Sequence, residues 1–306
     1  MSLLPSATEI VYALGLGDEL AGVTFECDEP SAARTDKTIV VGGLDTSGMA
    51  PGDIDRYVRA RLAAGEDLYT LHARALAGLA PDLILTQDLC RVCALPSAHV
   101  NEALDYLGCR ADVLTLDPHS LDEVLDSILL VGQRAGVPER AELVVAGLRE
   151  RLGAVAEGVA GLGRPRVAVV EWVDPPFTAG HWVPDLVTAA GGQPVAGRPR
   201  VPSVQATWAD IAAAEPEVVV VAPCGYHLAA AAEQARLAAA QLAAGQLAAG
   251  QLAAGRLGGV PVWAIDADGI VVRPGPRLVN GVEALASVIH PGAVPAPPPG
   301  TVQRVS

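Results

Sequence analysis

A predicted helix meets a predicted strand at Leu79-Ala80-Pro81-Asp82-Leu83-Ile84. The helix ends before the proline, and a short apolar strand, Leu83–Thr86, begins after the aspartate. The same order returns in the second half of the chain at Ala214-Glu215-Pro216-Glu217-Val218-Val219, where the strand is Val218–Val221. A helix that leads directly into a buried strand, found twice, predicts two α/β units with parallel sheets.

The elements around these two stretches follow the same alternation. Ser6 and Glu9 have the spacing of a capping box, which predicts that a helix begins there. Ser120 and Glu123 have the same spacing, and apolar residues at helical intervals follow them to residue 131. A further helix is predicted over 139–159. Additional short strands are predicted over 21–25, 38–41, 167–170 and 263–266.

This pattern predicts an α/β fold of two units with parallel sheets, joined by a long helix. We expect an N-terminal α/β lobe over 1–120, connecting helices over 121–162 and a C-terminal α/β lobe over 163–290. A proline-rich tail over 291–306 is expected to be disordered.

A low-complexity segment over 237–256 repeats Leu-Ala-Ala-Gly-Gln or close variants. A period of five places successive leucines about 140° apart on a helix, so they form no single apolar face. We expect a surface helix or loop without chemistry of its own.

The composition excludes several classes of function. The chain has 306 residues, of which 51% are hydrophobic, and a formal net charge of −14. A nucleic-acid binder normally carries a basic face, so we expect no nucleic acid as a partner. No stretch approaches the roughly 18 consecutive apolar residues of a membrane-spanning helix. Residues 1–5 lack the basic and apolar regions of a signal peptide, so we expect a cytoplasmic protein.

The start of the chain resembles a known family. Ser2-Leu3-Leu4-Pro5-Ser6-Ala7-Thr8-Glu9-Ile10 is similar to the opening of class III periplasmic binding proteins, in particular the vitamin B12-binding proteins of ABC importers. The two helix-to-strand stretches fit this family, and Arg273-Pro274-Gly275-Pro276-Arg277 resembles a late motif of its actinobacterial branch. The resemblance implies the class III fold, an α/β fold of two Rossmann-like lobes joined by a long helix. It also implies that cobalamin or a related corrinoid binds in a cleft between the lobes.

The chain departs from that family in three respects. The family's first strand precedes Leu3, so we expect a shortened strand or a gene start further upstream. No export signal is present. The resemblance also implies a carboxylate on each lobe that docks onto the permease, but the matching positions hold Arg74 and Ala209, with Asp210 beside the latter. Because these charges are reversed or lost, we do not expect docking to an ABC permease.

Four of the five cysteines follow predicted strands. Ligands of open α/β sheets bind at the carboxyl ends of the strands, so these thiols are expected to lie near the ligand. Their convergence would suit tetrahedral zinc or an iron–sulfur cluster. The alternative is that they are small buried residues, and Cys109 is expected to be structural. The predicted metal ligands are Cys27, Cys90, Cys93 and Cys224.

The other expected ligand contacts are aromatic, imidazole and polar side chains. The strand 167–170 leads into a Pro- and Gly-rich loop whose rings form a platform for a planar macrocycle. Imidazoles on these loops are able to ligate cobalt, iron or zinc. We predict that the ligand contacts Pro5, Ser6, Asp28, Gln87, Asp88, Trp172, Phe177, His181, Trp182, Tyr226 and His227.

Catalysis is not expected. Cys224 and His227 bring a thiol near an imidazole, but close sequence positions seldom supply the geometry of a nucleophile and its base. The chain has no G-x-S-x-G elbow, P-loop or H-E-x-x-H motif. The sequence therefore favours a corrinoid-binding protein, and the alternative is a cytoplasmic metalloprotein that binds zinc or an iron–sulfur cluster through its four cysteines.

Overall fold

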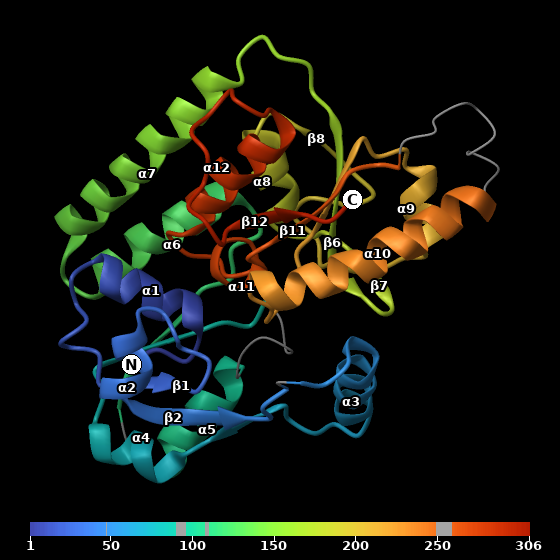
Figure 1. Ribbon diagram of the computed structural model, residues 1–306. Helices are drawn as coiled ribbons and strands as arrows, with labels where there is room; N and C mark the ends of the chain where they lie inside the picture. The colour runs from blue at the N-terminus through green and yellow to red at the C-terminus, as the bar shows by residue number, and fades with distance from the viewer. Residues whose placement is uncertain (47, 90–95, 108–109, 249–258) are drawn as a thin grey trace. The chain divides into compact units, whose positions relative to one another are not determined.

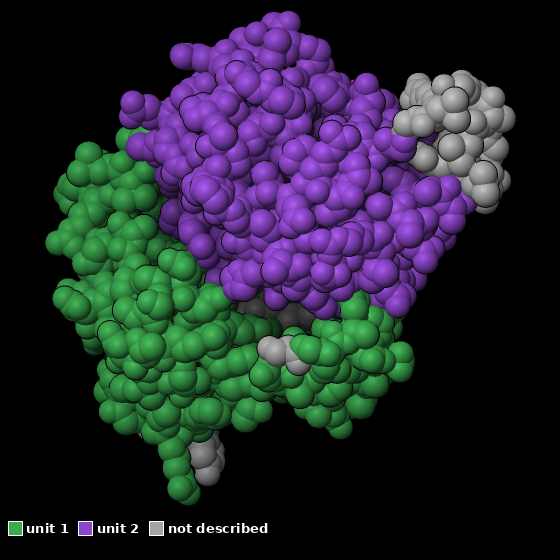
Figure 2. Space-filling model, in the orientation of Figure 1, with its two compact units in different colours: residues 1–118, 124–146 green, residues 119–123, 147–306 purple. Residues whose placement is uncertain are grey.

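The computed structural model describes residues 1–46, 48–89, 96–107, 110–248 and 259–306. The chain divides into two compact units (Figure 2): unit 1 comprises residues 1–118 and 124–146, and unit 2 comprises residues 119–123 and 147–306. Both units alternate helices and strands, so the expected α/β class is confirmed.

Unit 1 holds the first half of the element order in Figure 1. Its strands are β1 (Gly22–Thr24), β2 (Thr38–Gly43), β3 (Tyr69–Leu71), β4 (Leu83–Thr86) and β5 (Asp112–Thr115). Its helices are α1 (Pro5–Ala13), α2 (Ser31–Asp36), α3 (Pro51–Ala63), α4 (Ala73–Leu79) and α5 (Ser97–Leu107), followed by most of α6 (Leu121–Arg134) and the first turns of α7 (Pro138–Gly158).

The pairing in unit 1 is parallel for β1 with β2 and for β4 with β5, and antiparallel for β2 with β3. Residues 1–3 lie between the two parallel pairs. The Ser2 amide donates to the Gly22 carbonyl at 2.9 Å, and the Leu3 amide donates to the Leu85 carbonyl at 2.8 Å. The short N-terminal segment therefore takes the place of a strand between β1 and β4.

Unit 2 contains a larger sheet, whose strand order is β12-β11-β10-β6-β7-β9, with β8 paired to β6. These strands are β6 (Arg166–Val173), β7 (Pro176–Thr178), β8 (Gln193–Val195), β9 (Val204–Gln205), β10 (Val218–Val221), β11 (Val262–Ile265) and β12 (Val302–Arg304). The helices are α8 (Val183–Ala189), α9 (Trp208–Ala213), α10 (Leu228–Ala248), α11 (Ala267–Ile270) and α12 (Leu278–Ile289).

The centre of this sheet is parallel and is buried on both faces. β10 pairs in parallel with β6 and with β11, and all four valines of β10 are buried. Val219 and Val221 belong to a core that includes Ala231, Ala235 and other residues of α10. On the opposite face, α8 and α12 pack against each other. A parallel sheet with helices on both faces explains why these strands read as continuous apolar runs.

The C-terminal tail differs from the expectation of disorder. Residues 302–304 form β12, which pairs antiparallel with β11, and the Val305 amide donates to the Val262 carbonyl at 2.9 Å. Prolines upstream do not prevent this, because the strand itself contains none and keeps all its backbone donors.

The two predicted capping boxes have different outcomes. At α1, Leu4 is the N-cap and no side chain caps the helix; Pro5 occupies the first turn and Ser6 is buried inside it, so this prediction is wrong. Before α6, the Ser120 hydroxyl accepts from the Glu123 amide at 3.2 Å, as predicted. In a capping box, the Glu123 carboxylate would accept from the Ser120 amide. It accepts instead from the His119 amide at 2.6 Å.

The described part of the repeat segment is helical and forms the end of α10. Leu237 is exposed whereas Leu242 is buried, which confirms that the repeated leucines form no single face. The buried face of α10 is made mainly by the small residues Ala231, Ala232, Ala235 and Ala238, together with Gln234. None of the described helices is long and apolar enough to cross a membrane.

Candidate functional site

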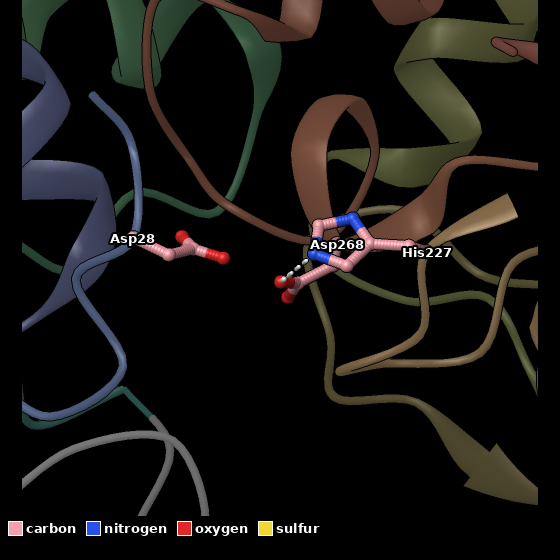
Figure 3. A group of neighbouring side chains, drawn as sticks. All are labelled: Asp28, His227 and Asp268. Atoms are coloured by element: carbon pink, nitrogen blue, oxygen red, sulfur yellow. Dashed lines mark ion pairs between the residues drawn. The ribbon is translucent and has the colours of Figure 1, made fainter. Parts of the chain in front are cut away.

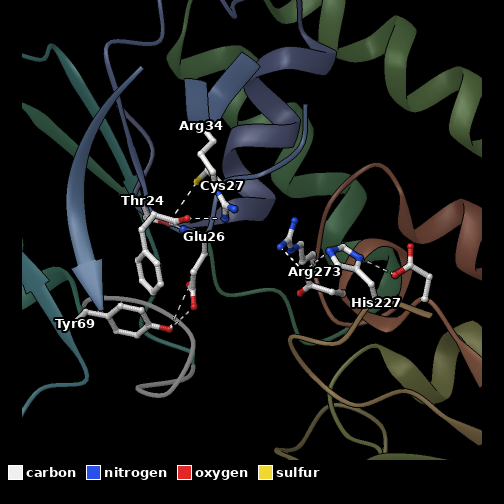
Figure 4. Close-up of polar contacts among 10 residues, drawn as sticks. Thr24, Glu26, Cys27, Arg34, Tyr69, His227 and Arg273 are labelled. Atoms are coloured by element: carbon white, nitrogen blue, oxygen red, sulfur yellow. Dashed lines mark hydrogen bonds and ion pairs between the residues drawn. The ribbon is translucent and has the colours of Figure 1, made fainter. Parts of the chain in front are cut away.

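The loop after β1 in unit 1 is held by side chains around a buried thiol (Figure 4). Cys27 is fully buried. Its Sγ lies 3.1 Å from the Thr8 hydroxyl oxygen and 3.4 Å from that of Thr24. Thr24 also accepts from the Glu26 amide at 3.1 Å. Burial among hydroxyl groups gives this thiol a structural role in closing the turn after β1.

Two further contacts fix the same loop. Arg34 of α2 donates to the Phe25 carbonyl at 2.6 Å. The Tyr69 hydroxyl lies 3.4 Å from both carboxylate oxygens of Glu26, and the rings of Tyr69 and Phe25 are 6.4 Å apart (Figure 4). Asp28, the next predicted contact, is half-buried in this loop.

The loop after β4 begins with two of the predicted ligand contacts. Gln87 is buried. The Asp88 carboxylate accepts from the Ser97 amide at 2.8 Å and from the Ser97 hydroxyl at 2.6 Å, while the Asp88 amide donates to Asp117 at 2.6 Å. Asp88 therefore fixes the start of α5.

The expected four-thiol metal centre is described only in part. Cys27 is buried in unit 1, and Cys224 is exposed in unit 2. Cys90, Cys93 and Cys109 lie outside the described residues. The hydroxyl contacts of Cys27 do not favour metal ligation, and the four-thiol centre stays a prediction.

In unit 2, the end of β6 and the strand β7 carry two of the predicted aromatic contacts. Trp172 pairs with Phe177 across the hairpin, so their side chains lie on the same face. Both rings are half-buried. The Trp172 ring nitrogen donates to the Asp174 carbonyl at 3.1 Å, which fixes the indole plane.

Glu171, directly before Trp172, ties the hairpin to a neighbouring loop. Its carboxylate accepts from the Gly180 amide at 3.2 Å and from the Ser203 hydroxyl. Gly180 is required here, because a Cβ at this position would lie 2.4 Å from the Ser203 amide nitrogen and 2.5 Å from the Val201 carbonyl oxygen. These contacts hold the aromatic hairpin rigidly.

The loop after β10 carries Tyr226 and His227 beside that hairpin. The rings of Tyr226 and Trp172 meet edge to face, with centroids 5.7 Å apart. Burial raises the pKa of Tyr226, so the phenol stays protonated at neutral pH. The next side chain, His227, is 65% exposed.

Two aspartates flank the His227 ring. Its Nδ1 lies 3.0 Å from Asp266 Oδ1. Its Nε2 lies 4.0 Å from Oδ2 of Asp268, and Figure 3 shows these two side chains next to each other. Asp268 in turn accepts from Arg273 at 2.5 Å, and both side chains are nearly buried. The Asp268 amide also donates to the Tyr226 carbonyl at 3.3 Å, which joins α11 to the loop after β10.

The motif Arg273-Pro274-Gly275-Pro276-Arg277 thus has a physical role. Arg273 pairs with Asp268. Arg277 Nη1 and Asp266 Oδ2 both border Gly269, since a Cβ there would lie 3.1 Å from the first and 3.0 Å from the second. One arginine of this short motif therefore pairs with a carboxylate that flanks His227, and the other lies near the second carboxylate. We call His227, Asp266, Asp268, Arg273 and Arg277 the imidazole network.

His181 and Trp182 lie elsewhere in unit 2. Trp182 is buried and its ring nitrogen donates to the Val271 carbonyl at 2.8 Å, a placement that favours packing over ligand contact. The ring of His181 stacks on that of Trp182, with ring centroids 5.6 Å apart. The ring centroids of His181 and His119 are 5.8 Å apart. Burial, and then the neighbouring His119, lower the pKa of His181.

Comparison with known proteins agrees with this architecture. The family model described as "Periplasmic binding protein" matches residues 1–258. The chain belongs to the periplasmic binding protein family. This family member is 24% identical over 224 residues to the vitamin B12-binding protein of Yersinia pestis (strain Pestoides F), an alignment that covers 72% of this chain and 68% of that protein.

Solved structures confirm the class III fold for this periplasmic binding protein. A periplasmic heme binding protein from Pseudomonas aeruginosa superimposes with a TM-score of 0.67 at 23% identity, over 100% of this chain and 96% of that one. The periplasmic vitamin B12 binding protein of Vibrio cholerae has a TM-score of 0.63 at 24% identity, over 94% of each chain. At this identity the likeness shows the fold alone.

Of the imidazole network, the sequence analysis singled out His227 and the motif that holds Arg273 and Arg277, but neither aspartate. Asp266 and Asp268 were missed because the proximity of the arginines to these carboxylates arises only in the folded chain. Of the positions compared with permease-docking carboxylates, Arg74 and Ala209 are exposed. Asp210, beside the latter, forms a capping box with Thr207 at the start of α9.

Proposed function

We propose that this periplasmic binding protein family member binds a corrinoid of the vitamin B12 type. The observation that carries the proposal is the edge-to-face pair of Trp172 and Tyr226, held beside His227 at the carboxyl ends of β6 and β10. This is the edge where open α/β sheets bind ligands. The B12-binding relatives and the B12-binding structural neighbour support this class of ligand.

The chemistry of the three side chains suits such a ligand. Flat aromatic rings bury the apolar face of a macrocycle at little cost in side-chain entropy. The protonated Tyr226 phenol is able to donate a hydrogen bond to the amide groups at the rim of a corrinoid. The rigid support of Trp172 by Asp174 and Glu171 reduces the ordering that binding requires.

The test is a titration of the purified full chain with cyanocobalamin, followed by calorimetry and by quenching of tryptophan fluorescence. We expect a one-to-one complex, and Trp172→Ala should weaken it at least about tenfold, or about 1.4 kcal/mol. Trp208→Phe is the matched control, because Trp208 packs against the core of unit 2. The affinity of this variant for cyanocobalamin should equal that of the unchanged protein.

Hemin is titrated in parallel, because a heme-binding protein is also among the structural neighbours. Binding of hemin without binding of any corrinoid would show that the ligand is a different tetrapyrrole and would overturn the proposal. Equal affinity of Trp172→Ala and the unchanged protein for cyanocobalamin would show that the aromatic pair is not the site.

A further inference from the structure

We propose that Glu171 is the residue that sets the spacing between Trp172 and Tyr226, the two rings of the ligand-binding aromatic pair. This inference rests on the proposed function and adds a positioning residue that acts through its neighbours. Trp172 follows Glu171 in β6, whereas Tyr226 lies in the loop after β10. Because the two rings come from different strands, their spacing depends on a residue that is connected to both.

The first argument is the place of Glu171 in the sheet. Val170 pairs with Thr178 and Trp172 pairs with Phe177, so β6 advances by two residues where β7 advances by one. This register shift makes Glu171 the extra residue of a β-bulge. Bulges bend a strand and change the direction of a side chain, and they are frequent beside functional sites. The bulge therefore sets the direction in which the Trp172 indole leaves the sheet.

The second argument is that the main chain of Glu171 also holds the loop of Tyr226. Beyond the end of β10, the Cys224 amide donates to the Glu171 carbonyl at 3.3 Å. The Tyr226 amide then donates to the Pro223 carbonyl at 3.2 Å, and Gly225 has a φ of 78°, which glycine adopts without strain. A tight turn thus connects this hydrogen bond to Tyr226. Glu171 is joined to one ring through the chain and to the other through this turn.

The third argument is that the side chain of Glu171 fixes the bulge. Its carboxylate accepts from the Gly180 amide at 3.2 Å and from the Ser203 hydroxyl. Gly180 lies just before α8 and Ser203 just before β9, so the bulge is bonded to two places along the chain. Hydrogen bonds to an ionised acceptor are stronger than those between neutral groups. Without this carboxylate, the bulge would be held by its backbone alone and the indole would sample several positions.

A pair of rings with several positions must be ordered by the ligand when it binds. This ordering reduces affinity even when the contacts in the complex are the same. We therefore expect that loss of the Glu171 carboxylate weakens corrinoid binding by about tenfold.

The first measurement uses no ligand. The full chain is labelled with fluorinated tryptophan, and its fluorine NMR spectrum is recorded. The chain has four tryptophans, and Trp172→Phe identifies the resonance of Trp172. Glu171→Ala should shift or broaden this resonance. Glu171→Gln should leave it in place, because the amide oxygen accepts from Gly180 and the amide nitrogen donates to the Ser203 oxygen.

The same variants are then titrated with cyanocobalamin. Glu171→Ala should bind about tenfold more weakly than the unchanged protein, and Glu171→Gln should bind equally well. Glu217→Ala is the matched control, because the Glu217 carboxylate accepts from the Arg166 amide at 2.9 Å at the opposite end of β6. Its loss removes a similar contact from the same strand and should change neither the Trp172 resonance nor the affinity.

The outcomes separate the two proposals. An unchanged Trp172 resonance in Glu171→Ala would overturn the positioning role. A loss of affinity in Glu217→Ala or Glu171→Gln as large as that in Glu171→Ala would overturn it as well. If the unchanged protein binds no cyanocobalamin, the proposed function fails, and the fluorine spectrum alone decides whether Glu171 positions Trp172.

Discussion

Among the side chains of unit 2, His181 is the clearest case in which burial opposes protonation. It has a positive φ of 47°, a conformation that histidine and asparagine adopt more readily than most residues. Its amide donates to the Val201 carbonyl at 2.7 Å, and its ring is enclosed by His119 and Trp182. Protonation places a charge in this half-buried position.

The pKa of His181 is lowered, so the folded chain favours the neutral ring more strongly than the unfolded chain does. The stability from this difference is fully present above the unfolded pKa of 6.5 and is lost as the pH falls through the lower folded value. Between about pH 7.5 and about pH 5, we expect the melting temperature of His181→Asn to fall less than that of the unchanged protein.

Gly153→Ala is the control for the His181 prediction, because it removes no titratable group and has open space around it, so its melting temperature should fall with pH as much as that of the unchanged protein. An identical loss of melting temperature in His181→Asn and the unchanged protein would show that His181 does not contribute to acid sensitivity.

Residue roles were the least predictable part of the site. The sequence placed Trp172, Tyr226 and His227 on loops after strands. The structure confirms this for Tyr226 and His227, whereas Trp172 lies in β6 itself, one residue before its end. It placed Trp182 there as well, although this ring is buried at the start of α8. Sequence position shows which loop holds a side chain, but the direction of the side chain depends on packing that only the folded chain provides.

At the scale of helices, replacing two glycines by alanine is expected to change the free energy of unfolding in opposite directions. Gly281 in α12 faces α11, where a Cβ would lie 2.1 Å from the Ile270 carbonyl oxygen. Gly153 in α7 has open space around it. We expect Gly281→Ala to lower the free energy of unfolding by about 1–3 kcal/mol or more, because the two helices must move apart.

Gly153→Ala is the matched substitution and should raise the free energy of unfolding by about 0.5–1 kcal/mol, since alanine loses less backbone entropy in a helix. Urea titration of both variants measures the difference. If Gly281→Ala were as stable as the unchanged protein, the close approach of α12 to α11 would be wrong.

Elements with strong periodicity were predicted well. The strands β4 and β10 have the predicted bounds, and α6 and α7 follow the apolar pattern. Among the elements that the sequence analysis did not predict are α3 and β3. None of the residues of α3 is buried, so this helix has too little apolar periodicity to be recognised. β3 has three residues and pairs antiparallel with β2 across the intervening α3.

At the scale of the whole molecule, the fold was predictable and the ligand was not. Two helix-to-strand stretches and the opening motif identified the family, because parallel α/β units repeat the same local pattern. The ligand is chosen by a few side chains on loops, and members of one fold bind different ligands. The heme-binding and B12-binding structural neighbours illustrate this separation.

A ligand that binds only the folded chain must raise its stability. At a free corrinoid concentration of about one hundred times the dissociation constant, we expect the free energy of unfolding to rise by about 2.7 kcal/mol. Differential scanning calorimetry with and without cyanocobalamin measures the shift. Trp172→Ala should show a smaller shift at the same concentration, and an unchanged melting profile of the unmodified protein would contradict specific binding.

The strands that end the sheet of unit 2 limit self-association. An open strand edge offers unpaired backbone groups to a second chain, and proteins restrict this with short strands and charged side chains. β12 has three residues and exposes Gln303 and Arg304, while β9 at the other end has two residues. By pairing with β11, the C-terminal residues cover one open edge of a parallel, valine-rich sheet. Such cover is a means of preventing aggregation, and it is provided by a segment far in sequence from the proposed ligand contacts.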